Sequence, residues 1–151
     1  MREDFLIEMG FPGLTGRLKR LNDQFVYQTK QFYKEKGVEI EPNWHMIFSL
    51  LKKHENLTIT EISEMLQLSN PAIVKLVNKM KKRGYLQSIQ DSNDHRKYQI
   101  SLSQKAKNQL PEMEILWEAG SQAIEELLGE DSKLLKKLEI LESNMAELNC
   151  K

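Results

Sequence analysis

The strongest constraint on the fold lies in residues 58–84, where two helix starts and two helix stops follow one another closely. Thr58 and Glu61 form the pattern of a capping box, in which each side chain bonds the other residue's backbone amide. After a short turn, Ser69 is a favourable cap for a second helix, and Gly84 is a favourable residue to end it. The stretch therefore predicts two short helices joined by a tight turn.

Two short β-type runs follow directly, YLQSI at 85–89 and YQISL at 98–102. The segment between them, QDSNDHRK, is polar and rich in turn residues, which predicts a hairpin with a charged tip. The order of helix, turn, helix and hairpin is that of a winged helix-turn-helix. Most of the remaining chain has helical spacing, so the predicted fold class is mostly α with a small β-hairpin wing.

The 151 residues suit a single domain with one core. Apolar side chains recur at steps of four and three near both ends, over 14–32 and 134–148. Either stripe alone is most simply explained by internal burial, but two stripes flanking a separate centre favour packing against a second copy. The predicted division of the domain 1–151 is dimerisation helices at 1–37 and 104–151 and a winged helix-turn-helix lobe at 42–103.

The charge of the chain is unevenly distributed although the net charge is zero. Residues 1–51 are balanced, with 7 Lys and Arg against 7 Asp and Glu, whereas residues 52–111 hold 11 against 5. Residues 112–151 hold 4 against 10. A polyanion is attracted to the basic middle and repelled by the acidic end, which favours a nucleic-acid partner over a chance run of solvated lysines.

The second helix of the pair has two distinct faces. At about 100° per residue, its apolar residues Ile73, Leu76, Val77 and Met80 share the inner face. Lysine and asparagine on the opposite face suit phosphates and base edges of a major groove, and the helix start suits a phosphate. The alternative is an ordinary solvated face. The predicted DNA-binding residues here are Ser69, Asn70, Pro71, Lys75, Asn78, Lys79 and Lys82.

The hairpin tip carries three further predicted DNA-binding residues, His95, Arg96 and Lys97. A cation on a thin loop can enter a minor groove, where the negative potential is strongest, and Arg96 is the first candidate. Asp94, two residues earlier, is predicted to support the wing by holding the guanidinium. The alternative is a surface ion pair of little energetic value.

Other classes of function receive little support. No glycine-rich phosphate loop or nucleophile motif is present, so an enzyme is not expected. His45, His54 and His95 lack metal-ligand spacing, so no metal or cofactor is expected. Cys150 is the only cysteine, which favours the reducing cytoplasm, and no apolar run of about 20 residues suits a membrane. The alternative function is a winged-helix protein-interaction module without DNA binding, although such modules generally lose the basic face.

Between about residues 40 and 107 the chain resembles the MarR family of bacterial transcription regulators. The matching stretches are EPNWHMIFSLL, LTITEISEMLQLSNPAIVKLVNKMKKRGYLQS and DSNDHRKYQISLSQKA, the last containing the Asp94-x-Arg96 wing signature. The resemblance implies a homodimer on a near-palindromic double-stranded operator. It also implies a repressor released by a small aromatic or anionic effector.

The resemblance implies an effector pocket as well, whose lining segments in this chain carry Arg17, Tyr27, Trp44 and His45. The chain lacks the cysteine in the first helix that marks the redox-sensing subgroup, and its histidines do not match a zinc-switched member. A small-molecule effector is what the resemblance implies, and the sequence itself does not show whether there is one or what it is.

Overall fold

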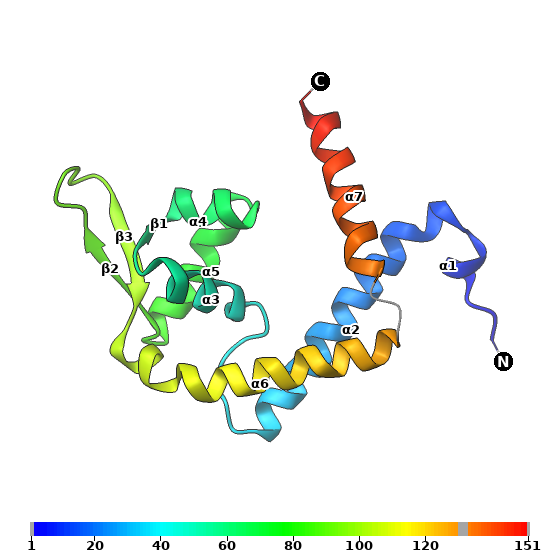
Figure 1. Cartoon of the computed structure of the whole chain (residues 1–151), viewed down its shortest axis with the longest axis horizontal. Coiled ribbons are helices and arrows are strands. Elements are labelled where there is room, and N and C mark those ends of the chain that lie inside the picture. Colours follow the sequence, from blue (N-terminus) through cyan, green and yellow to red (C-terminus); the bar gives the residue numbers. More distant parts are fainter. Residues whose placement is uncertain (1, 130–132, 151) are drawn as a thin grey trace. The chain divides into compact units, whose positions relative to one another are not determined.

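The computed structural model describes residues 2–129 and 133–150. The elements in chain order are α1 (Phe5–Glu8), the 3-10 helix η1 (Phe11–Gly13), α2 (Leu14–Glu35), α3 (Trp44–His54), β1 (Leu57–Thr58), α4 (Ile59–Leu66), α5 (Asn70–Lys82), β2 (Leu86–Gln90), β3 (Tyr98–Leu102), α6 (Gln104–Leu128) and α7 (Lys133–Asn149) (Figure 1). The predicted fold class is confirmed, because the chain is mostly helical with one small antiparallel sheet. It divides into two compact units, Met1–Asn108 and Gln109–Lys151.

The helix-turn-helix is built from local hydrogen bonds. The Thr58 hydroxyl accepts from the Glu61 amide at 3.2 Å, and the Glu61 carboxylate accepts from the Thr58 amide at 2.8 Å, so the capping box is confirmed. Gln67 ends α4 in the left-handed conformation, with φ 53° and ψ 40°. Ser69 then caps α5 by accepting from the Ala72 amide at 3.3 Å.

The core of the first unit lies beneath α5. The side chains at most 2% exposed in α3, α4 and α5 are Trp44, Ile47, Phe48, Leu51, Ile62, Ile73, Val77 and Met80. Full burial of a large apolar side chain stabilises a fold by about 1.5–3 kcal/mol. The predicted inner face of α5 therefore anchors this helix to α3 and α4, and the opposite face is left to solvent.

The sheet has the strand order β1-β3-β2 and is antiparallel throughout. The hairpin pairs Leu86 with Leu102 and Ser88 with Ile100, while Leu57 pairs with Ile100 from the other side. The predicted hairpin is confirmed, with its first strand one residue later than expected. The two-residue strand β1 was not predicted.

Two local expectations are wrong. The spacing of Ile62, Met65 and Leu66 predicts Met65 on the inner face of α4, but it is 48% exposed, because this two-turn helix buries only a narrow stripe around Ile62. Because proline suits the first turn of a helix, the sequence predicts that Pro42 begins the next helix, but α3 begins two residues later. Pro42 lies instead in a turn closed by the Trp44 amide, which donates to the Glu41 carbonyl at 3.1 Å.

Two further helix ends are predicted from the sequence, one by Gly37 and one by the segment Gly-Glu-Asp-Ser at 129–132. Gly37 ends α2 with φ 69°, and the Val38 amide donates to the Tyr33 carbonyl at 2.9 Å, as a glycine-capped helix end requires. Gly129 follows α6 with φ 72°. The rest of the break expected over 129–132 lies outside the described residues.

A short N-terminal arm packs on α2 within the first unit. The Arg20 guanidinium donates to Asp4 at 3.1 Å and forms an ion pair at 2.9 Å, and this hydrogen bond holds the pKa of the Asp4 carboxyl below its ordinary value. Gly13 is required beneath α1, because a Cβ there would lie 2.1 Å from the Leu6 carbonyl oxygen.

Candidate nucleic-acid interface

The outward face of α5 carries the predicted base-reading residues. Pro71, Lys75, Asn78 and Lys82 are exposed, whereas Ile73, Val77 and Met80 on the opposite face are at most 1% exposed. Ser69 and Asn70 are exposed at the helix start, where backbone amides and the helix dipole favour an anion. One face of a rigid helix therefore offers cationic and amide donors together.

The cations of the last turn of α5 have separate partners. Lys79 Nζ lies 3.8 Å from Glu41 Oε2, and both side chains are about half exposed, so this weak pair leaves Lys79 available to a stronger anion. Lys81 Nζ donates to the Ser88 hydroxyl at 2.9 Å, and Arg83 Nη1 donates to the Glu39 carbonyl at 3.4 Å. Lys81 and Arg83 thus tie the helix end to its surroundings, a role that spacing alone did not reveal.

The wing tip is a turn stabilised by acidic side chains. Asp94 Oδ1 accepts from the Arg96 backbone amide at 3.0 Å and lies 3.7 Å from Arg96 Nε. The Asp91 carboxylate accepts from the Asn93 amide at 2.8 Å. The Arg96 side chain is 95% exposed, and His95 is exposed beside it. Asp94 therefore shapes the backbone of the tip as well as facing the guanidinium.

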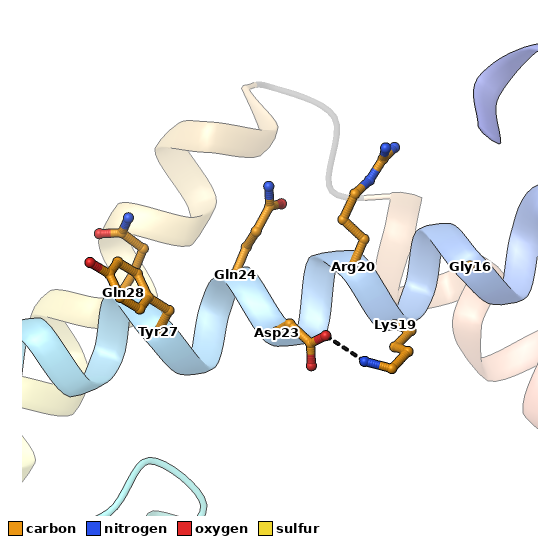
Figure 2. Close-up of a pocket in the computed structure, with 7 residues that line it drawn as sticks. All are labelled: Gly16, Lys19, Arg20, Asp23, Gln24, Tyr27 and Gln28. Carbon is orange, nitrogen blue, oxygen red and sulfur yellow. Dashed lines mark hydrogen bonds and ion pairs between the residues drawn. The ribbon is translucent and has the colours of Figure 1, made fainter. Parts of the chain in front are cut away.

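The predicted effector residues are not gathered in one place. A depression of about 460 Å³ on α2 is lined by Gly16, Lys19, Arg20, Asp23, Gln24, Tyr27 and Gln28 (Figure 2). Tyr27 is the one predicted pocket residue among them. Arg17 is exposed elsewhere on α2, and the His45 ring nitrogen Nδ1 lies 2.7 Å from the Pro42 carbonyl oxygen. Trp44 is fully buried, where it packs in the core.

Polar and charged residues surround the depression on α2, although most of the exposed surface that lines it is apolar. Arg20, Gln24 and Gln28 extend from the same side of the helix, at steps of four residues (Figure 2). Lys19 and Asp23 pair with each other at 2.6 Å. Guanidinium and amide donors beside a phenol suit an anion that also has an aromatic or hydroxylated part.

Metal and membrane sites find no support in the part of the chain that the structure describes. Within residues 2–129 and 133–150, no three His, Cys, Asp or Glu side chains gather as a metal site would need. Among the same residues, no helix combines the length and apolarity needed to cross a membrane. Cys150 is exposed just after α7.

A capped helix-turn-helix followed by a short hairpin, with lysine and asparagine on the exposed face of the second helix, defines the winged-helix class of DNA-binding proteins. The MarR family model matches residues 39–97, which span α3 to the wing tip. Over these residues the chain matches the MarR family, whose members are DNA-binding transcription regulators. Members of this family are not enzymes.

Solved structures share the fold over most of the chain. Overoxidized AbfR bound to DNA is 18% identical with a TM-score of 0.70, and the match covers 89% of this chain and 91% of that one. A MarR protein from Peptoclostridium difficile is 19% identical, with a TM-score of 0.67 and coverages of 89% and 85%. BpsR of Bordetella bronchiseptica is 15% identical, with a TM-score of 0.67 and coverages of 88% and 98%. No curated protein sequence matches the chain.

Proposed function

We propose that this regulator is a cytoplasmic repressor that binds a near-palindromic double-stranded operator as a homodimer and leaves it when a small aromatic or anionic effector binds. The observation that carries the proposal is the pairing of two exposed cationic features in one unit. The outward face of α5 presents Lys75, Asn78 and Lys82, and the hairpin after it presents Arg96. One lobe thus offers donors for a major groove and a cation for the neighbouring minor groove.

The proposed roles divide by residue type and position. Lys75 and Asn78 lie in the middle of the exposed face of α5 and would read base edges. The remaining proposed contacts on the helix, at its two ends and its flank, would bind phosphates and orient the lobe. These are Ser69, Asn70, Lys79 and Lys82, whereas Pro71, which has no donor, would contact the DNA only by van der Waals packing. On the wing, His95 and Lys97 would flank Arg96.

The apolar faces of the terminal helices support dimerisation. In α2, Leu18, Leu21 and Phe25 are 42–48% exposed. In α7, no side chain between Lys133 and Asn149 is buried, and Leu141 and Met145 are 40% and 52% exposed. Apolar stripes with steps of four and three are stable in water when another helix covers them. A second copy would supply such helices and bring a second lobe to the other half-site.

The effector proposal rests on the depression on α2. Arg20 is paired with Asp4 and would bind an effector carboxylate in exchange for, or beside, that partner. Tyr27 could contact an aromatic ring, with Gln24 adding amide hydrogen bonds. The regulation of DNA binding by 6-hydroxynicotinic acid described for BpsR provides a relevant probe, because that acid combines a ring with a carboxylate.

The DNA-binding proposal is tested by recovering bound fragments from sheared genomic DNA of the source bacterium and sequencing them. We expect one recurring near-palindrome, bound at least about 1,000-fold more tightly than a random duplex of equal length. Asn78→Ala should relax preference at one position in each half-site, whereas Lys107→Ala, on α6, is the matched surface control. Recovery without any common sequence would contradict sequence-specific regulation, and no recovery would favour an interaction module.

The effector proposal is tested separately, on the complex with a recovered fragment. We expect 6-hydroxynicotinic acid or another aromatic acid from a panel to raise the melting temperature of the protein and release the DNA. Arg20→Met should abolish both responses, and Lys30→Met, a lysine farther along α2, should keep them. Failure of the whole panel would refute an aromatic-acid effector and leave the DNA-binding result intact.

A further inference from the structure

Only three residues connect the recognition helix α5 to the wing strand β2. This connection, here called the joint, consists of Arg83, Gly84 and Tyr85. Gly84 has φ 81°, a conformation that favours glycine, and the Tyr85 amide donates to the Met80 carbonyl at 3.0 Å. The joint therefore reverses the chain in one tight step, and its geometry sets the angle between the two DNA-contacting elements.

All three carbonyl oxygens of the joint are bound by two residues at the start of α6. Lys105 Nζ donates to the Arg83 carbonyl at 2.8 Å. The Ser103 hydroxyl donates to the Gly84 carbonyl at 2.6 Å, and the Ser103 amide donates to the Tyr85 carbonyl at 2.9 Å. One neighbouring turn thus binds every backbone acceptor of the joint, which restrains the joint closely.

The side chains of the joint are restrained as well. The Tyr85 ring meets Trp44 and Phe48 edge-on, with centroid separations of 5.8 and 5.6 Å, and Lys105 Nζ lies 4.3 Å from the centre of the same ring. Burial raises the pKa of the Tyr85 phenol, and the Glu39 carboxylate raises it further, so the ring remains neutral. Lys105 thus bridges a helix-end carbonyl and an aromatic core.

We propose that Lys105 and Ser103 are positioning residues for DNA binding, which hold the recognition helix and the wing in a single geometry. A lysine is suited to this place because a cation is favoured at the carbonyl end of a helix, and the last turn of α5 ends at Arg83. The tie between Lys81 and Ser88 adds a further link between helix and wing. The inference rests on the proposed contacts of α5 and the wing with DNA.

A direct phosphate contact is the rival explanation for a lysine near this interface. The two differ in a measurable way, because each lost phosphate contact lowers the slope of log affinity against log salt by about 0.9. A positioning residue instead weakens binding at every salt concentration by about the same factor. The ammonium of Lys105 already donates to the Arg83 carbonyl and lies over the Tyr85 ring, so we expect it to act as a positioning residue.

The first experiment compares Lys105→Met with Lys105→Arg and with the control Lys107→Met, which removes the same charge two residues along α6. The probe is the tightest genomic fragment recovered by the wild-type chain, and binding is followed by anisotropy across a salt series. We expect Lys105→Met to bind about fivefold to tenfold more weakly with an unchanged slope. Lys105→Arg and Lys107→Met should stay within about twofold of wild type. A slope lowered by about 0.9 per subunit in Lys105→Met would overturn the proposal.

The second experiment asks whether Ser103 and Lys105 restrain the same joint. Ser103→Ala is made in the wild-type chain and in Lys105→Met. If both residues hold one geometry, the loss of affinity caused by Ser103→Ala should be at least about threefold smaller in the Lys105→Met background, with the salt slope unchanged in every variant. Equal losses in both backgrounds would show that the two residues do not act through one joint.

A third measurement needs no DNA. Amide hydrogen exchange at Gly84 and Tyr85 should quicken in Lys105→Met and remain unchanged in Lys107→Met. Unchanged exchange in Lys105→Met would refute the restraint itself. A wild-type chain that binds no duplex would refute the proposed function, and the exchange result would still decide whether Lys105 restrains the joint.

Discussion

The wing arginine gives the most direct test of how this regulator binds DNA. The Arg96 side chain is 95% exposed, and its Nε lies 3.7 Å from Asp94. An ion pair this exposed contributes about 0–1 kcal/mol to folding, so Arg96→Ala should leave the free energy of unfolding within about 0.5 kcal/mol. Any large effect on affinity would then come from the contact with DNA.

The size of that effect follows from counterion release. If each Arg96 neutralises the equivalent of one phosphate, a dimer loses about 1.8 units of log–log salt slope on Arg96→Ala. Between about 50 and about 200 mM salt, the wild-type advantage should shrink about tenfold. The preferred major-groove bases should not change, because a minor groove is read by its width and A·T content.

Two variants of Asp94 test whether this residue supports the wing arginine, because its Oδ1 accepts from the Arg96 amide at 3.0 Å. Asp94→Asn keeps an acceptor and should bind nearly as well as wild type, whereas Asp94→Ala loosens the turn and should show part of the Arg96→Ala loss. Anisotropy across a salt series, with melting curves as the folding control, measures all three. If Arg96→Ala keeps wild-type affinity and slope, the wing is a structural hairpin and the reasoning fails.

Four further results are expected. Leu141→Glu places a charge on the apolar stripe of α7 and should yield a monomer or an aggregate in sedimentation; a soluble monomer with full DNA affinity would contradict dimerisation through this helix. Asn78→Ala should cost about 1–3 kcal/mol on the specific site, and equal weakening on random DNA would mean that it touches only phosphate. Gln67→Gly should raise the free energy of unfolding by about 0.5–1 kcal/mol, because φ 53° is unfavourable for glutamine, and a lower melting temperature would refute this. The contact between Asp4 and Arg20 should stabilise the fold above the ordinary carboxyl pKa of 3.8 and be lost as the pH falls through the lowered folded-state pKa; an NMR titration of Asp4 at or above 3.8 would contradict it.

Local patterns predicted the helix-turn-helix because its hydrogen bonds join residues close in sequence. The cap at Thr58 bonds a residue three positions away, as does the cap at Ser69. The two faces of α5 follow from its helical period, so the exposure of Lys75 and Asn78 was predictable too. The wing was predictable as well, because the signature around Asp94 is a short run of residues adjacent in sequence.

Positions whose environment depends on distant elements were harder to predict. The strand β1 consists of two residues and exists only through pairing with β3. Thr58 lies opposite Gln99, 41 residues away, and Leu57 lies opposite Ile100, 43 residues away. Met65 has the spacing of a core residue, but the neighbours of α4 leave it exposed. Trp44 lies on a segment that the resemblance assigns to a ligand pocket, with packing as the alternative, and its burial against Tyr85 fits packing.

The sequence by itself therefore determined the class of fold and which face of α5 is exposed, because periodicity and capping act over a few residues. Only the tertiary structure decided what Lys105 contacts, since it meets Arg83 and Tyr85 across more than one element of the fold. Its spacing on α6 resembles that of any solvated lysine. A hydrogen bond between residues distant in sequence depends on how the whole unit packs, and no local pattern encodes that.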